Sequence, residues 1–137
     1  MATSLTRIVR FRATHRYWRP DWPAERNQRT FGVLIEPHSH DYSCGVTVSG
    51  RIDPVSGMVM DLAELDRILA EEVVGRMDRQ DLNDLPPFRE GQPLPTCEAL
   101  ATLVFGRILA RLPAGLHLDR VRIEEDPTLY AECSSAD

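Results

Sequence analysis

Three of the four histidines in the chain stand where their side chains could meet. His38 and His40 lie two residues apart at the start of an alternating segment, and alternation in a strand places both side chains on one face. His15 ends an earlier alternating segment, and we expect the two segments to pair. Three imidazoles that converge near strand ends would supply three nitrogen ligands and leave a fourth position open, as in a catalytic rather than a structural zinc site. The pattern therefore predicts a metal centre if the two segments form a hairpin.

A His-x-His pair alone is weak support for this site, and cupins use the same pair. In a cupin a glutamate follows four or five residues on, where this chain has Cys44 and Gly45, so the cupin interpretation is disfavoured. The fourth histidine, His117, lies beside Gly115 in a predicted connection, and we expect it to be an exposed loop residue.

Lysine is absent from the chain, because all 16 basic residues among its 137 residues are arginines. Without a lysine amine, Schiff-base catalysis, attachment of pyridoxal phosphate and the phosphate-binding loop that ends in Gly-Lys-Ser/Thr are excluded. Any carbon–carbon bond chemistry must therefore depend on a metal or on acid–base groups.

The net charge of −5 is unevenly distributed. Residues 1–30 carry seven arginines and two acidic residues, which gives that segment +5 and the remainder −10. The acidic whole argues against nonspecific nucleic-acid binding, whereas the arginines suit a small phosphorylated ligand, an acidic partner or a solvated strand face. Three cysteines without Cys-x-x-Cys spacing indicate neither a disulfide framework nor a cysteine zinc site. With no apolar targeting segment and no apolar run of about 18 residues, we expect a soluble, cytoplasmic protein that does not bind membranes.

Paired strands are expected on either side of a helical region. Alternation predicts strands over residues 6–14 and 42–52, joined by a long polar and aromatic connection over residues 17–37. Two further strands are expected over residues 118–125 and 129–133.

Two helices are expected between these strand pairs. Apolar residues at helical spacing predict one helix that follows an Asp61–Glu64 capping box and runs to about Met77. Thr96 can cap a second helix, whose apolar side extends to Leu112. The order β-β-α-α-β-β, in a single domain over residues 1–137, favours the α+β class with an antiparallel sheet, and open sheet edges invite oligomerisation.

Six segments, spread in order over nearly the whole chain, carry a family resemblance. They are Phe11–Arg16 (FRATHR), Pro37–Tyr42 (PHSHDY), Gly57–Leu62 (GMVMDL), Met77–Asn83 (MDRQDLN), Pro95–Ala101 (PTCEALA) and Val121–Thr128 (VRIEEDPT). Together they resemble the 6-pyruvoyltetrahydropterin synthase and 6-carboxytetrahydropterin synthase family. No single segment is specific, but the six in this order and spacing are.

The resemblance implies the tunnelling fold, in which β-β-α-α-β-β subunits with two helices on one face combine their sheets into a barrel. Such subunits usually form trimers stacked into hexamers, so a homo-oligomer is expected. The resemblance also implies a zinc ion (Zn²⁺) held by His15, His38 and His40, and a pterin whose guanidine-like edge is anchored by Glu125. A carboxylate opposite two adjacent N–H donors makes a bidentate contact, which fixes the orientation of the ligand. Substrate contacts from Thr96 and Glu98 are further, weaker implications.

Two positions of the chain depart from the catalytic pattern of that family. In such enzymes a cysteine base, assisted by an aspartate–histidine pair, moves protons while zinc polarises hydroxyl groups of dihydroneopterin triphosphate. Here Leu34 stands at the cysteine position, and the aspartate–histidine step reads Asp78-Arg79. Leucine cannot take a proton, and an arginine with a pKa above about 12 cannot shuttle one near neutrality.

The three histidines and Glu125 are kept, so we expect a metal and pterin-like pocket, and the two departures predict that its chemistry is altered. Asp78, Glu36 and Asp41 are the candidate bases, and Arg79 marks the altered proton-transfer position. The principal hypothesis is a zinc-dependent lyase or cyclase that acts on a pterin or a related substrate. A pterin-binding pseudoenzyme, or a partner of an active paralogue, is the second hypothesis, and an oligomeric scaffold without a ligand is the third. The sequence leaves open whether the metal is zinc or iron, and whether subunits share the site.

Overall fold

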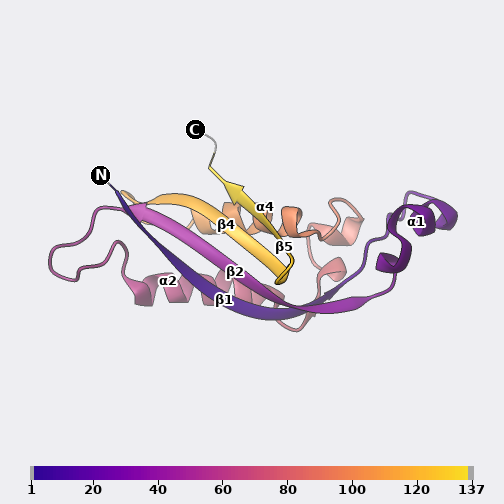
Figure 1. The fold of residues 1–137 in the computed structure, drawn as a ribbon, viewed down its shortest axis with the longest axis horizontal. Helices are drawn as coiled ribbons and strands as arrows, with labels where there is room; N and C mark the ends of the chain where they lie inside the picture. Colours follow the sequence, from indigo (N-terminus) through magenta and orange to yellow (C-terminus); the bar gives the residue numbers. More distant parts are fainter. Residues whose placement is uncertain (1, 136–137) are drawn as a thin grey trace.

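The computed structural model describes residues 2–135, which form one five-stranded sheet with helices packed on one of its faces (Figure 1). The strand order is β3-β1-β2-β4-β5. The strands are β1 (Thr3–His15), β2 (His38–Gly50), β3 (Gln80–Asp81), β4 (His117–Asp126) and β5 (Leu129–Ser134). The α-helices are α1 (Ala24–Phe31), α2 (Leu62–Leu69), α3 (Gly75–Met77) and α4 (Cys97–Leu109). Short 3₁₀ turns are η1 (Gly32–Ile35), η3 (Leu82–Asp84) and η4 (Phe88–Glu90), and η2 (Ala70–Val74) is a π-helical turn.

The predicted hairpin of the first two long strands is confirmed. β1 and β2 pair antiparallel along their whole length, from Thr3 opposite Gly50 to His15 opposite His38. Alternation places odd residues of β1 and even residues of β2 on the helix-covered face, where Phe11 stacks on Tyr42 with ring centroids 4.9 Å apart. The register therefore determines which side chains meet at the end of the hairpin where His15 lies opposite His38.

The core lies between the sheet and the helices. Buried side chains of β2 meet two apolar helix stripes, and the residues are Cys44, Val46 and Val48 on β2, Leu65, Ile68 and Leu69 on α2, and Leu100, Val104 and Ile108 on α4. Each such side chain stabilises the fold by about 1.5–3 kcal/mol relative to exposure, so the core holds the hairpin against the helical layer. On the opposite face the hydroxyl groups of Thr6 and Thr47 lie 2.6 Å apart, and Ile8 is an exposed apolar residue.

Both predicted helices form, with differences at their ends. The Asp61 carboxylate accepts from the Ala63 N–H at 3.0 Å, one residue earlier than a capping box with Glu64 requires. The helical path continues through α2, η2 and α3 and ends at Met77, as predicted. Thr96 caps α4 through the Ala99 N–H at 3.1 Å, but α4 ends at Leu109, so residue 112 lies beyond the helix rather than on its stripe.

Two elements were not expected from the sequence. The connection over residues 17–37 contains α1, which extends beyond the ends of β1 and β2, away from the helical layer (Figure 1). Its one buried side chain is Asn27, whose amide accepts from the Arg19 N–H at 2.8 Å, so no apolar stripe marks this helix. The second element is β3, which pairs parallel with Ala13 and Thr14 of β1, so the sheet is not wholly antiparallel. Within residues 2–135, no helix is long and apolar enough to cross a membrane.

Candidate metal centre and adjoining carboxylate

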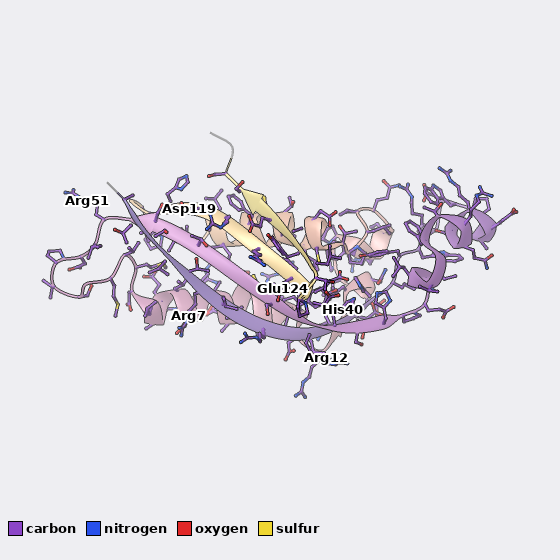
Figure 2. All side chains as sticks on the ribbon, viewed as in Figure 1. Arg7, Arg12, His40, Arg51, Asp119 and Glu124 are labelled. Carbon is purple, nitrogen blue, oxygen red and sulfur yellow. The ribbon has the colours of Figure 1, made fainter. Side chains whose placement is uncertain are left out.

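Strand register brings the three predicted histidine ligands together. His15 is the direct partner of His38, and Ala13 is the partner of His40, so all three imidazoles lie on the core-facing side at one end of the hairpin. Their ring centroids are 4.6–5.1 Å apart, and one nitrogen of each lies within 4.8 Å of the others. Figure 2 shows His40 at the end of the sheet opposite Asp119. The hairpin on which the sequence prediction depended thus forms a compact nitrogen cluster.

Hydrogen bonds to backbone carbonyl groups determine which imidazole nitrogens of this cluster keep a lone pair that could bind a metal. His15 Nδ1 lies 2.8 Å from the Pro95 oxygen, and His38 Nδ1 lies 2.8 Å from the Glu36 oxygen. A carbonyl oxygen only accepts, so each Nδ1 carries the proton and each Nε2 is left as a potential ligand. The Nε2 atoms of His15 and His40 are buried and have no hydrogen-bond partner among residues 2–135. Unpartnered buried nitrogens in this arrangement fit a metal ion with three histidine ligands.

Burial of His15 lowers its pKa, and the neighbouring His38 and His40 lower it further. The bond to Pro95 acts in the opposite direction but does not reverse the shift. The side chain is therefore neutral near pH 7, which is the form that binds a metal. Tyr17 and Tyr42 pack edge-on against His15, and burial raises the pKa of both phenols, so both remain protonated.

Glu125, the predicted ligand anchor, adjoins the histidines near the end of β4. Its side chain is only 11% exposed, and its Oε2 lies 3.4 Å from His40 Nε2, which is too long for a strong hydrogen bond. The other oxygen, Oε1, accepts from the Cys97 thiol at 3.3 Å. With His40 and Asp126, Glu125 forms a second group of possible metal ligands, but Asp126 Oδ1 already accepts from the Thr128 N–H at 2.7 Å and from its hydroxyl at 2.6 Å. Glu125 is therefore a mostly buried carboxylate that lies beside the candidate metal ligands.

Thr96 and Glu98, the weaker predicted substrate contacts, line an open groove of about 690 Å³ at the start of α4. Arg19 from the segment before α1 lies on the groove, with apolar side chains that include Leu103. Thr96 uses its hydroxyl to cap α4, whereas Glu98 is exposed. The groove adjoins Cys97, which links it to Glu125.

Asp78 and Arg79 have roles at the sheet edge in the described protomer. Asp78 Oδ1 accepts from the Arg12 N–H at 2.9 Å, and the Arg79 N–H donates to the Arg12 carbonyl at 2.6 Å. Arg79 adopts a left-handed backbone conformation with φ of 61°, and its side chain is 90% exposed. No contact recorded within residues 2–135 joins either side chain to the histidine cluster, and the Arg79 side chain points into solvent.

The other two candidate bases differ in position. Asp41 lies on the face of β2 opposite His40, where it pairs with Arg12 at 2.9 Å and is 78% exposed. Glu36 has an exposed side chain just before β2, and its carbonyl orients His38. Leu34 lies in η1 and is 40% exposed, and its carbonyl accepts from the Tyr17 N–H at 2.9 Å. Asp41 and Glu36 both lie near the end of the hairpin that carries the histidines. Of these two carboxylates, only Glu36 has no ion-pair partner recorded within the described part of the chain.

Sequence reasoning missed three contributors to the site. Tyr17 lies two residues beyond His15, and Pro95 and Cys97 flank the predicted cap of α4. For Tyr17, its position just after the first strand was the one feature of the sequence that could have placed it near His15. The contacts of Pro95 and Cys97 join residues far apart in the chain and carry no local pattern.

Together, the α+β fold and the three-histidine cluster beside a mostly buried carboxylate define the class as an α+β protein with a candidate metal centre. The 6-pyruvoyl tetrahydropterin synthase family model matches residues 4–136. The chain is 36% identical over 124 residues to 6-pyruvoyl tetrahydrobiopterin synthase from Poecilia reticulata, covering 88% of this chain and 82% of that protein. It is 34% identical over 124 residues to the human protein of that name, with 88% and 83% covered.

Solved structures show the same likeness. The 6-pyruvoyl tetrahydropterin synthase of Caenorhabditis elegans superposes with a TM-score of 0.88 at 28% identity, covering 99% of this chain and 97% of that one. The Plasmodium vivax enzyme of that name, at 14% identity and a TM-score of 0.66 over 97% of each chain, shares the fold. This chain belongs to the 6-pyruvoyl tetrahydropterin synthase family, a family of lyases in pterin metabolism. The predicted family and tunnelling fold are confirmed.

Proposed function

We propose that the chain is a zinc-dependent lyase or cyclase for a pterin of the dihydroneopterin triphosphate kind, or a related substrate, with acid–base chemistry altered from that of its family. The observation that carries this proposal is the pair of buried, unpartnered Nε2 atoms of His15 and His40 beside the Glu125 carboxylate. Nitrogen ligands and a ligand-anchoring carboxylate are both needed for such a reaction, and both lie at one end of the hairpin.

Each residue of the site has a distinct task in this proposal. His15, His38 and His40 hold the zinc ion, which when bound polarises hydroxyl oxygens of the substrate side chain. Glu125 accepts from the two adjacent N–H groups of the pterin edge and so fixes the orientation of the ring. Thr96 and Glu98 contact the substrate from the groove at the start of α4.

Glu36 is the base that the structure favours. Asp41 is on the wrong face of β2, and Asp78 is engaged by the Arg12 N–H. Two solved structures of Plasmodium vivax 6-pyruvoyltetrahydropterin synthase are those of variants of a catalytic glutamate in that protein. A glutamate can thus serve this chemistry, and Glu36, which precedes the His-x-His pair by two residues, takes the proton that neither Leu34 nor Arg79 can accept.

The test is an assay of dihydroneopterin triphosphate turnover by the zinc-loaded protein. Turnover is measured as the release of triphosphate and the appearance of new carbonyl products. Glu36→Gln keeps the shape of the side chain but removes the base, so kcat falls by about 10²–10⁴-fold while zinc content stays constant. Glu25→Gln, at an exposed position in α1, is the matched control and leaves kcat unchanged. Wild-type turnover by Glu36→Gln would exclude Glu36 as the base.

A second function, a pterin-binding pseudoenzyme or a partner of an active paralogue, is favoured by one observation. By the family resemblance Leu34 stands at the cysteine position and Arg79 at the histidine position, and neither a leucine nor an arginine shuttles a proton near neutrality. Pterin binding without turnover in the same assay would establish this function.

In either case we propose a trimer-based homo-oligomer, with a hexamer as the expected form. β3 covers only Ala13 and Thr14 of β1, so most of that strand has an open edge.

A further inference from the structure

The thiol of Cys97 contacts Glu125, and the proposed reaction does not use this contact. Cys97 is the first residue of α4 and is 2% exposed. Its Sγ donates to Glu125 Oε1 at 3.3 Å, across 28 positions of the sequence. Cys44, by contrast, is buried in the apolar core, and Cys133 lies half-buried on the edge strand β5. Cys97 is the cysteine that adjoins the candidate site.

One short segment supports both halves of that site. The Pro95 carbonyl accepts from His15 Nδ1 at 2.8 Å, and two residues later the Cys97 thiol reaches Glu125. Thr96 between them caps α4 through the Ala99 N–H, which anchors the segment to the first turn of a 13-residue helix. The segment therefore sets where a metal ligand and the carboxylate lie relative to each other.

We propose that Cys97 is a positioning residue, whose thiol holds Glu125 Oε1 so that the carboxylate faces the ligand space beside His40. This inference rests on the proposed function, in which Glu125 anchors a pterin. The thiol occupies one oxygen on the protein side, which limits rotation of the carboxylate. A preoriented acceptor binds paired N–H donors more tightly than one that must first be ordered.

The thiol acts as a donor rather than as a nucleophile or base. Burial, the hydrogen bond to Glu125 and the charge of Glu125 raise the pKa of Cys97 to about 12, so the proton stays on sulfur near neutrality. The residue is also too buried to reach a substrate directly. Its effect must therefore pass through Glu125.

Binding of unsubstituted pterin to the zinc-loaded protein, measured by fluorescence titration, tests the proposal. Cys97→Ala removes the donor and weakens binding by about 5- to 20-fold, the range expected for one hydrogen bond to a charged group when the donor is a weak thiol. Cys97→Ser restores a donor and returns Kd to within about 3-fold of wild type. Cys133→Ala removes a thiol elsewhere and leaves Kd unchanged, and zinc content is the same in all variants.

Two results in that titration would overturn the inference. One is wild-type affinity in Cys97→Ala while Glu125→Ala loses binding, because the anchor would then work without the thiol. The other is equal weakening in Cys97→Ala and Cys97→Ser, which would indicate packing rather than hydrogen bonding.

A measurement without ligand separates this inference from the proposed function. The infrared S–H stretching band that disappears in Cys97→Ser belongs to this thiol, and Glu125→Gln shifts it to higher frequency because the charged acceptor is lost. A band that does not respond to Glu125→Gln overturns the inference even if pterin binds. If the band responds but wild-type protein binds no pterin, the proposed function fails, and the positioning of a pterin anchor fails with it.

Discussion

The histidine cluster predicts that zinc stabilises the folded chain and that His38→Ala abolishes this effect. His38 is the suitable position for the substitution, because His15 is only 1% exposed and its removal would also leave a cavity, whereas His40 contacts Glu125. His38 is only half-buried at the strand end, so its replacement removes a nitrogen ligand with little loss of packing.

The size of the effect follows from binding linkage. Free zinc at 100 times its Kd stabilises the folded state by about 2.7 kcal/mol. For a chain of 137 residues one kcal/mol corresponds to about 3–5 °C, so Tm rises by about 8–13 °C. Loss of a direct ligand weakens binding by at least about 100-fold, since even outer-shell changes cost about 10–100-fold. At the same zinc concentration the variant then gains only about 0.4 kcal/mol, or about 1–2 °C.

The assay is thermal unfolding with and without zinc, together with metal analysis after gel filtration. His117→Ala is the matched control, because this imidazole is 63% exposed at the start of β4, where it lies 2.6 Å from the Asp119 carboxylate. It keeps the full zinc-induced rise in Tm. The metal assignment is refuted if zinc leaves wild-type Tm unchanged, or if His117→Ala and His38→Ala lose the zinc effect equally.

Two further predictions concern carboxylates away from the cluster. Asp78→Ala removes the acceptor for the Arg12 N–H at the sheet edge and lowers the free energy of unfolding by about 0.5–1.5 kcal/mol, whereas Asp78→Asn keeps an acceptor and is near neutral in urea denaturation. Equal losses in both variants would contradict the hydrogen-bond role. Hydrogen bonds from His117 and Ser49 lower the pKa of Asp119 from its usual 3.8, so its stabilisation is complete above pH 3.8 and is lost as the pH falls through the lower folded-state pKa. Asp119→Asn therefore flattens the acid side of the stability–pH curve, and an unchanged acid side would refute this origin.

The elements that could be predicted from the sequence are those whose side chains alternate or repeat against the core. The strands around Phe11 and Val46 were predicted because burial on one face leaves a two-residue period. Helix α1 has no such period, because its buried residue is the polar Asn27, and β3 is too short at two residues to show one. Neither α1 nor β3 could therefore be predicted from the sequence pattern.

The same limit applies to the site. His15, His38 and His40 could be placed together because strand parity and one hairpin determine their faces. The Cys97–Glu125 contact depends on how α4 docks against β4, which no local spacing encodes. Glu36 was one of three candidate bases in the sequence, and only the strand faces and the hydrogen bond to Asp78 distinguish it from the others.

The division between core and turns also bears on the proposal that the chemistry of this chain is altered while its candidate metal ligands are kept. The three histidines belong to the register of β1 and β2, which the buried core fixes, so moving any of them would disturb a strand that packs against two helices. Leu34 and Arg79 instead lie on a 3₁₀ turn and on the turn after α3, with side chains 40% and 90% exposed. Substitution of an exposed side chain such as that of Leu34 usually changes stability by no more than about 0.5 kcal/mol, whereas the left-handed backbone at Arg79 limits that position to residues that accept a positive φ. A proton-transfer group on an exposed turn can therefore change with less effect on the fold than a strand residue, so we expect the proposed altered chemistry to arise at the turns and the proposed metal ligands to stay on the strands.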